Sequence, residues 1–153
     1  MITNGRTGPV VFVDKGHHNF HTKSGRYRAF SDLLERDGYV VRSYAGEFEK
    51  SGLKEGKILV ISNALHPFND TNWYKPVLSA FSPKEIKTVK KWVKQGAFRT
   101  YGKGKVVAFG EAAMFTAQLA GPNQIRMGMN NDAAPENYQL LMNIVHWLDG
   151  KLE

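Results

Sequence analysis

The sequence predicts an α/β domain with a mainly parallel sheet and helices on both of its faces. Three short apolar runs, at 9–14, 57–62 and 105–110, have the length and the β-branched composition of buried strands, and turn residues bound each of them. Segments with helical periodicity alternate with strands along the chain. Because this alternation is typical of strand–helix–strand units, we expect the strands to lie parallel in one sheet.

The first half of the chain supplies most of the predicted sheet. Its elements are, in order, a strand over 9–14, a helix over 24–37, a strand over 39–44, a short helix or turn within 46–54, a strand over 57–62 and a polar, aromatic loop over 63–81. In the long helix, Tyr27, Phe30 and Leu34 lie on one apolar stripe, and Gly38 supplies a C-terminal stop.

The second half begins with the clearest helix start in the chain. Ser82 is a predicted N-cap, Pro83 occupies the first turn, and Glu85 follows three residues after the cap, which is the pattern of a capping box. Gly96 is predicted to end this helix. The remaining predicted elements are a hairpin over 97–110, a short helix over 111–119, an irregular loop over 120–134 and a last helix from Pro135 to Gly150.

Composition limits the class of protein. A chain of 153 residues suits one domain, 1–153. No run approaches the ~20 apolar residues that span a membrane, and the polar N-terminus lacks a signal-peptide pattern, so we expect a cytoplasmic protein that does not bind membranes. The absence of cysteine excludes disulfides and thiolate ligands. The net charge of +7 comes without a nucleic-acid-binding motif, so nucleic acid is not an expected partner.

Polar side chains follow the ends of three predicted strands. They are Asp14, His17, His18, Asn19 and His21 after the first strand, Asn63 and His66 after the third, and Glu111 after the last. The carboxyl ends of parallel strands share one edge of a sheet, and ligands bind in the crevice there. We therefore expect these side chains to converge on one site.

The predicted catalytic residues are His17, His66 and Glu111. Histidine titrates near neutrality and can serve as a general base or as a metal ligand. If the segment after the first strand turns helically, His17 and His21 lie one turn apart, a spacing that suits two metal ligands. A divalent metal, with zinc favoured, is thus predicted at His17, His21, His66 and Glu111. The alternatives are an ordered loop for the histidines and a helix N-terminal carboxylate for Glu111.

Supporting roles are predicted for six further residues. Asp14 and His18 are expected to hydrogen-bond to the metal ligands and so fix their orientation. The predicted substrate contacts are Asn19, Asn63, Met129 and Asn130. For Asp14 a turn-forming role is equally compatible with the sequence, and the segment of Met129 and Asn130 is either a lid or a loop without a chemical role. No glycine-rich phosphate loop is present, so no nucleotide cofactor is expected.

Several of these motifs resemble those of one protein family. The segment 14–22 fits the pattern D-x-x-H-x-N-F-H-T, residues 63–66 read N-A-L-H, and 110–115 read G-E-A-A-M-F. With these motifs the chain resembles an uncharacterised bacterial family with a class I glutamine amidotransferase-like, flavodoxin-like domain, distantly similar to trehalose-utilisation-type domains. In related amidotransferases a sharp turn comparable to the one at Glu111 carries a nucleophilic cysteine.

The chain departs from that family after Gly96. Members usually continue with a further apolar strand, an Asp-His pair and a long insertion, whereas here Gly96 leads almost directly into the run at 105–110. The resemblance therefore implies a three-layer, flavodoxin-like sheet shortened by one strand and an insertion. Because the shortening would leave a strand edge open, we expect a homodimer, with Trp73, Tyr74, Phe98 and Tyr101 near the interface.

Two functions are compatible with the sequence. The first is a small hydrolase, acting on small-molecule esters, lactones or phosphoesters, in which histidines and a carboxylate activate water, with or without a metal. The second is a non-catalytic ligand-binding or scaffold domain of the same superfold.

Overall fold

A computed structural model describes residues 7–72, 74–95, 105–109 and 112–152. In chain order its strands and helices are β1 (Val10–Asp14), α1 (Arg28–Arg36), β2 (Val40–Tyr44), α2 (Lys50–Leu53), β3 (Gly56–Val60), α3 (Pro67–Asp70), α4 (Pro83–Gln95), the 3-10 turn η1 (Ala113–Phe115), β4 (Ala117–Ala120), β5 (Ile125–Gly128) and α5 (Asn137–Asp149).

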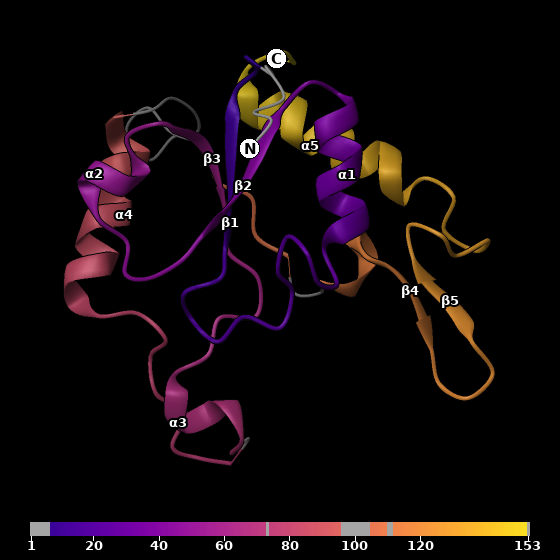
Figure 1. The fold of residues 1–153 in the computed structure, drawn as a ribbon, viewed down its shortest axis with the longest axis horizontal. Coiled ribbons are helices and arrows are strands. Elements are labelled where there is room, and N and C mark those ends of the chain that lie inside the picture. Colours follow the sequence, from indigo (N-terminus) through magenta and orange to yellow (C-terminus); the bar gives the residue numbers. More distant parts are fainter. Residues whose placement is uncertain (1–6, 73, 96–104, 110–111, 153) are drawn as a thin grey trace, which may run out of the picture.

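The central sheet contains β2, β1 and β3 in that order, all parallel (Figure 1). In β1 the core side chains alternate between the faces of the sheet, because successive residues of a strand point to opposite sides. Val11 and Val13 lie in one hydrophobic cluster, and Phe12 lies in the other. The predicted mixed α/β fold with a parallel sheet is confirmed.

Helices cover both faces of the sheet. The cluster around Val11 and Val13 includes buried side chains of α1 and α5, whereas the cluster around Phe12 includes Leu53 of α2 and Val89 and Trp92 of α4. Figure 1 shows α2 and α4 on one side of the strands and α1 on the other. The result is three layers with a core on each side of the sheet.

Most of the predicted helices and strands are present with shifted ends. The helix predicted from residue 24 begins at Arg28, because residues 22–27 form turns in which Gly25 and Tyr27 donate backbone hydrogen bonds to the Thr22 carbonyl. The predicted stop at Gly38 is confirmed; its φ of 95° is a left-handed conformation that glycine adopts without steric cost. Gly150, with a φ of 85°, ends α5 in the same way.

Two predictions for the second half are wrong. Residues 105–109, predicted as part of a strand, form no strand, because their backbone has no neighbouring strand to pair with among the described residues. The helix predicted over 111–119 is only the short turn η1. Thr116 ends this turn by donating both its N–H and its hydroxyl to the Ala113 carbonyl, and β4 follows directly. Of the hairpin predicted over 97–110, residues 97–104 and 110 lie outside the described residues.

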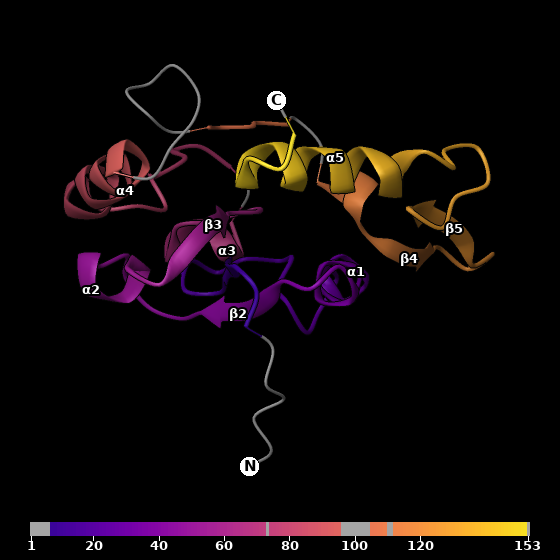
Figure 2. The same ribbon diagram turned by 90° about the horizontal axis from the view of Figure 1, so that it is seen from above.

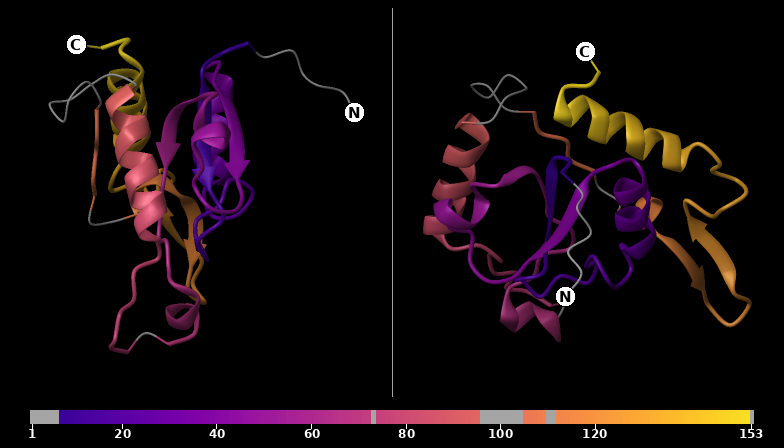
Figure 3. Two further views of the ribbon diagram at one scale, coloured as in Figure 1. Left: turned by 90° about the vertical axis from the view of Figure 1, so that its left-hand side faces the viewer. Right: turned by 45° about the horizontal axis from the view of Figure 1, so that its top comes forward.

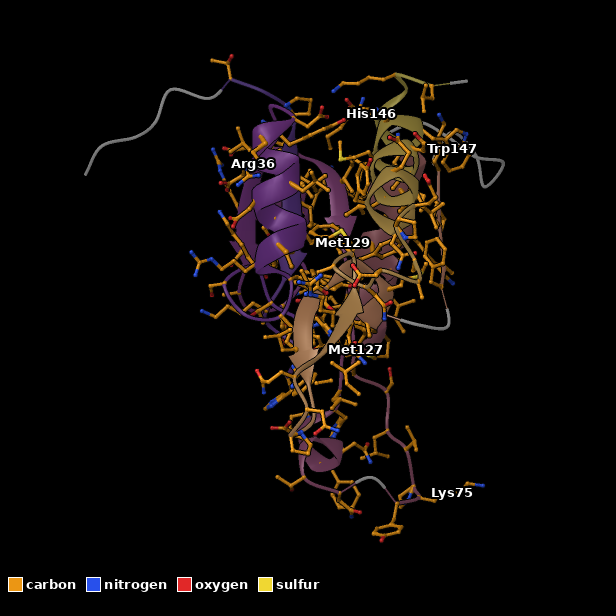
Figure 4. All side chains as sticks on the ribbon, turned by 90° about the vertical axis from the view of Figure 1, so that its right-hand side faces the viewer. Arg36, Lys75, Met127, Met129, His146 and Trp147 are labelled. Carbon is orange, nitrogen blue, oxygen red and sulfur yellow. The ribbon has the colours of Figure 1, made fainter. Side chains whose placement is uncertain are left out.

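A second, small sheet forms where no strand is predicted: β4 lies mostly in the predicted helix 111–119, and β5 lies in the predicted loop 120–134. β4 and β5 pair antiparallel and project away from the central strands (Figure 1). Met127 lies on β5, and Met129, one residue past it, packs against the cluster formed by α1 and α5 (Figure 4). The hairpin is therefore connected to the main core mainly at its base.

Surface features bear on the expected partners. None of the helices formed by the described residues is long and apolar enough to cross a bilayer. Of the aromatic residues expected near a dimer interface, Trp73, Phe98 and Tyr101 lie outside the described residues, and Tyr74 is 82% exposed. The homodimer stays a prediction.

Leu53 tests the core that joins α2 and α4 to the sheet. Its side chain is completely buried, so Leu53→Ala should lower the free energy of unfolding by about 3 kcal/mol. Leu119 on β4 is 54% exposed, and Leu119→Ala should cost well under half as much. Urea denaturation of both variants measures the difference, and equal losses would contradict the described core.

Candidate functional site

His17, in the loop after β1, is buried and contacts two carboxylates. Its Nδ1 lies 3.0 Å from both carboxylate oxygens of Asp14, and its Nε2 lies 2.7 Å from Oε1 of Glu85. The ring contacts Phe48 and Phe81, with centroid separations of 4.7 and 4.8 Å, and those two rings stack on each other. All three members of this ion network, Asp14, His17 and Glu85, are buried.

The start of α4 places Glu85 in this network. The predicted capping box is present: Ser82 Oγ accepts the Glu85 N–H at 3.2 Å, and Glu85 Oε2 accepts the Ser82 N–H at 2.9 Å. The other oxygen, Oε1, accepts the Phe48 N–H at 3.0 Å and faces His17. One side chain thus caps its own helix and joins it to the loops after β1 and β2.

Electrostatics favours the charged forms of the network. For His17, burial opposes the charge, but hydrogen bonds and attraction from Asp14 and Glu85 outweigh it and raise the pKa above the ordinary value of 6.5. For Glu85, burial again opposes the charge. The hydrogen bonds from Ser82, Phe48 and His17 outweigh it and lower the pKa to about 2. With a carboxylate at each ring nitrogen, the protonated form of His17 can donate one hydrogen bond to Asp14 and one to Glu85.

This geometry leaves His17 without a free ring nitrogen. A general base or a metal ligand needs an unprotonated nitrogen directed at its partner. In His17 both nitrogens contact carboxylates, and the rings of Phe48 and Phe81 pack against the imidazole. The arrangement therefore holds the loop after β1 against the N-terminus of α4.

The loops after β1 and β3 meet, as the sequence predicts. Asn19 donates from Nδ2 to Asp14 Oδ2 at 2.9 Å and to the Ser62 carbonyl at 3.1 Å. The Leu65 N–H donates to the His17 carbonyl at 2.8 Å. Asn19 is therefore a bridge between the two strand ends, and its amide is directed at protein groups.

The other histidines are dispersed around this junction. His21 is buried against the ring of Tyr27, on the α1 side of the sheet, whereas His17 packs on the α4 side. His18, with a φ of 49°, faces Asp70 at 3.1 Å on the surface. His66 is the N-cap of α3, where its Nδ1 accepts the Phe68 N–H at 3.0 Å. The residues 17–21 form no helical turn.

A metal at the predicted ligands stays a prediction. Glu111, one of the four, lies outside the described residues. Within the described part of the chain, no three histidine, aspartate or glutamate side chains are grouped so that they could hold a metal ion. The fifth histidine, His146, pairs with Asp37 at 2.7 Å and links α5 to the end of α1 (Figure 4).

The remaining residues predicted to contact a substrate lie at two places in the structure. Asn63, with a φ of 48°, follows β3 and accepts the Ser62 hydroxyl at 3.1 Å. Met129 and Asn130 lie past β5, with Met129 packed on the main core. The Oδ1 of Asn130 is buried and has no hydrogen-bond partner among the described residues. The structure therefore brings Asn63, but neither His17 nor His66, to the cavity described next.

A cavity of about 400 Å³ lies beside β3. One wall is β3 and the residues that follow it, 58–63, and another is the segment 107–109. The floor is the apolar face of α5, with Leu141, Ile144, Val145 and Leu148. The start of α1 adds Tyr27 and Phe30, and the η1 region adds Ala112 and Phe115. Among the described lining residues, polar side chains occur only at one end, where the Ser62 hydroxyl lies 3.4 Å from the Tyr27 hydroxyl.

Extended backbone borders the cavity on two sides. β3 pairs with β1 on one side, and in the described part of the chain nothing pairs with its other side. Figures 2 and 3 show the segment 105–109 beyond that free side of β3. From Val106 to Phe109 the backbone makes no hydrogen bond to any described residue.

Side chains hold this segment at its two ends. The ammonium of Lys105 lies 4.6 Å from the centre of the Trp147 ring and donates to the Trp147 carbonyl. Phe109 packs edge to face on Phe115, with centroids 5.3 Å apart. Val106 and Phe109 nevertheless remain about half exposed. The segment is thus fixed in an extended form while its backbone groups stay available.

Comparisons with known proteins add no assignment: no protein-family description, no curated protein and no solved structure matches the chain.

Sequence reasoning missed two of the residues that matter here. Glu85 was recognised as half of a capping box, but its second oxygen also binds a histidine 68 positions earlier in the chain. The capping-box pattern and the histidine-rich strand end lie far apart in the sequence, and neither pattern indicates that the two side chains meet in the fold. Ser62, the last residue of the apolar run, was assigned to the strand, although its hydroxyl marks the polar end of the cavity.

Glu85→Gln should destabilise the fold by about 3 kcal/mol. The substitution keeps the size of the side chain but leaves the buried imidazolium with one counter-charge, and breaking a buried pair is costly. Glu55 provides the matched control, because its pair with Arg42 is exposed and Glu55→Gln should cost less than about 1 kcal/mol. Equal losses for the two variants, measured by chemical denaturation, would refute a buried ion network.

The network should also give stability a defined pH dependence. The raised pKa of His17 contributes stability that is complete below 6.5 and is lost as pH rises through the folded-state value. The lowered pKa of Glu85 contributes stability above 4.5 that is lost as pH falls toward about 2. The stability difference between the wild type and His17→Gln should therefore be largest between pH 4.5 and 6.5. Thermal unfolding of both proteins across pH checks this, and a difference that grows above pH 6.5 would contradict it.

Proposed function

We propose that this chain is a non-catalytic binding domain that takes up an extended segment of another polypeptide between β3 and residues 105–109. The observation that carries the proposal is the cavity of about 400 Å³ with extended backbone on two of its sides. In the described residues, the outer side of β3 and the backbone of Val106 to Phe109 both lack hydrogen-bond partners.

The physical basis is strand addition. An exposed strand edge presents a row of unpaired N–H and C=O groups, which an extended peptide can satisfy. Here a guest strand would have a row on each side, and apolar side chains of α5 beneath it. Backbone pairing supplies affinity in this mode of recognition, and the pockets for alternate side chains supply specificity.

We also infer that the fold is flavodoxin-like with one strand missing. Flavodoxin-like sheets have the order 2-1-3-4-5, and the observed order β2-β1-β3 equals its first three positions. Segment 105–109 then takes the place of the last strand, and the cavity takes the place of the one before it. The motifs quoted above support this inference, since the resemblance implies a chain shortened by one strand after Gly96.

Hydrolysis, the other function compatible with the sequence, has less support. In that hypothesis a histidine or Glu111 activates water. Both nitrogens of His17 face carboxylates and Nδ1 of His66 caps α3, while Glu111 lies outside the described residues. The cavity walls carry no histidine, aspartate or glutamate side chain among the described residues. Binding therefore accounts for more of the geometry than turnover does.

A synthetic peptide tests the proposal. The heptapeptide TVTVTVT, blocked at both ends, should bind and should slow amide hydrogen exchange in Val106–Phe109 and on β3. Ala108 lines the cavity, so Ala108→Trp should fill part of it and weaken binding at least tenfold. Calorimetry measures the affinity, and exchange detected by mass spectrometry locates the peptide.

Ala133 provides the control, because it is exposed and does not line the cavity. Ala133→Trp should bind the peptide like the wild type. If a neutral naphthylamine dye binds in the cavity and no peptide does, the site takes small apolar molecules. If the protein turns over a panel of esters and phosphoesters, hydrolysis is the better account. Either result would overturn strand uptake.

A further inference from the structure

The two faces of β3 present different chemistry to a neighbouring strand. Ile58 and Val60 belong to the cluster on the α5 side. By alternation Lys57, Leu59 and Ile61 lie on the opposite side, and Leu59 indeed packs in the cluster with α4. Lys57 and Ile61 are exposed there. A strand placed beside β3 therefore meets an apolar surface on one face and a lysine on the other.

The orientation of α4 extends this second face. Val89 and Trp92 are its sheet-facing residues, and Trp92 donates from Nε1 to the Leu53 carbonyl of α2 at 2.9 Å. Lys84 lies on the flank toward α2, where its ammonium is 3.4 Å from Glu49 just before that helix. Figure 2 shows α2, then α4, then segment 105–109 in order across the sheet. The flank of α4 opposite Lys84 is therefore turned toward the cavity side.

That flank carries Ile86, Lys90 and Val93, because residues three or four apart share one side of a helix. Ile86 is 41% exposed and Lys90 is exposed. Neither Lys90 nor Lys57 forms an ion pair with a described residue, although Lys84 on the other flank lies near two glutamates. Among the described residues, Lys57 and Lys90 thus place two ammonium groups without ion-pair partners on the α4 side of the sheet, although neither side chain lines the cavity itself.

We propose that the guest is an amphipathic acidic strand of a different protein. Building on the strand uptake proposed above, its alternate apolar side chains pack on Ile58, Val60 and α5, and its alternate carboxylates face Lys57 and Lys90. Opposite charges placed across neighbouring strands attract, and like charges repel. The guest therefore follows a two-residue apolar–acidic repeat.

Charge also argues against a second copy as the guest. The chain carries a net charge of +7, so a partner with the same charge would add repulsion to a face that already holds unpaired lysines. None of its own apolar strand runs alternates with carboxylates. An acidic partner gains attraction at the same place.

Three blocked heptapeptides test the proposal: TVEVEVT, TVTVTVT and TVKVKVT. By calorimetry at low salt, the acidic peptide should bind about tenfold tighter than the neutral one, and the basic peptide should bind weakest. One charge pair with Lys57 across neighbouring strands and one with Lys90 on α4 would together give this difference. At about 1 M salt, where the Debye length is about 3 Å, the three affinities should converge.

Charge reversal provides the second arm. In the double variant Lys57→Glu/Lys90→Glu the order of the acidic and basic peptides should invert, whereas Lys50→Glu, on exposed α2, should leave it unchanged. If the neutral peptide binds as tightly as the acidic one, or if the order survives the double variant, the acidic guest is wrong and strand uptake stands. If no peptide binds, both proposals fail. A homodimer that TVEVEVT does not dissociate would also overturn the acidic guest.

Discussion

The positions of the loops in this protein depend on one buried interaction, the imidazolium of His17 held between the carboxylates of Asp14 and Glu85. Desolvating three charges is expensive, and such a group is tolerated only when hydrogen bonds satisfy its members. Here Asn19 and Gly16 donate to Asp14, while Ser82 and Phe48 donate to Glu85. The network therefore connects the end of β1 with the start of α4 and, through Phe48, with the loop after β2.

Two features of the sheet have opposite consequences. β1 is paired on both sides, and its side chains enter both cores, so it is the most constrained part of the chain. β3 is paired on one side among the described residues and borders a cavity on the other. Exposed strand edges are usually covered or charged, because they recruit other strands. Under the proposed strand uptake, Lys57 and Lys90 on the α4 side of the sheet would restrict which strands can pair there.

The sequence predicted the local elements well, because their causes are local. Alternating β-branched runs gave β1, β2 and β3, and the Ser82–Glu85 pattern gave the start of α4. It failed where distant partners decide the structure. Residues 105–109 have the composition of a strand, yet a strand requires a paired neighbour, and the cavity separates them from β3. Thr116 stopped a predicted helix through two hydrogen bonds to Ala113.

The same reasoning applies to the candidate site. That the ends of β1 and β3 meet followed from parallel topology, and Asn19 confirms it by bridging Asp14 and the Ser62 carbonyl. The partners of the histidines could not be predicted in the same way. An imidazole can accept a hydrogen bond, donate one or bind a metal, and the neighbouring residues in the sequence do not decide among these.

The ion network and the cavity are mechanically connected through Ser62. Its carbonyl is fixed by Asn19, which in turn is fixed by Asp14, while its hydroxyl lies at the polar end of the cavity. The network therefore holds the carboxyl end of β3 in place before any guest arrives. A preformed edge loses little conformational freedom on binding, and this saving favours affinity. On the other side, the anchoring of segment 105–109 through Trp147 and Phe115 has the same effect. Under the proposed strand uptake, a buried charge network remote from the guest would contribute to recognition by keeping one wall of the cavity rigid.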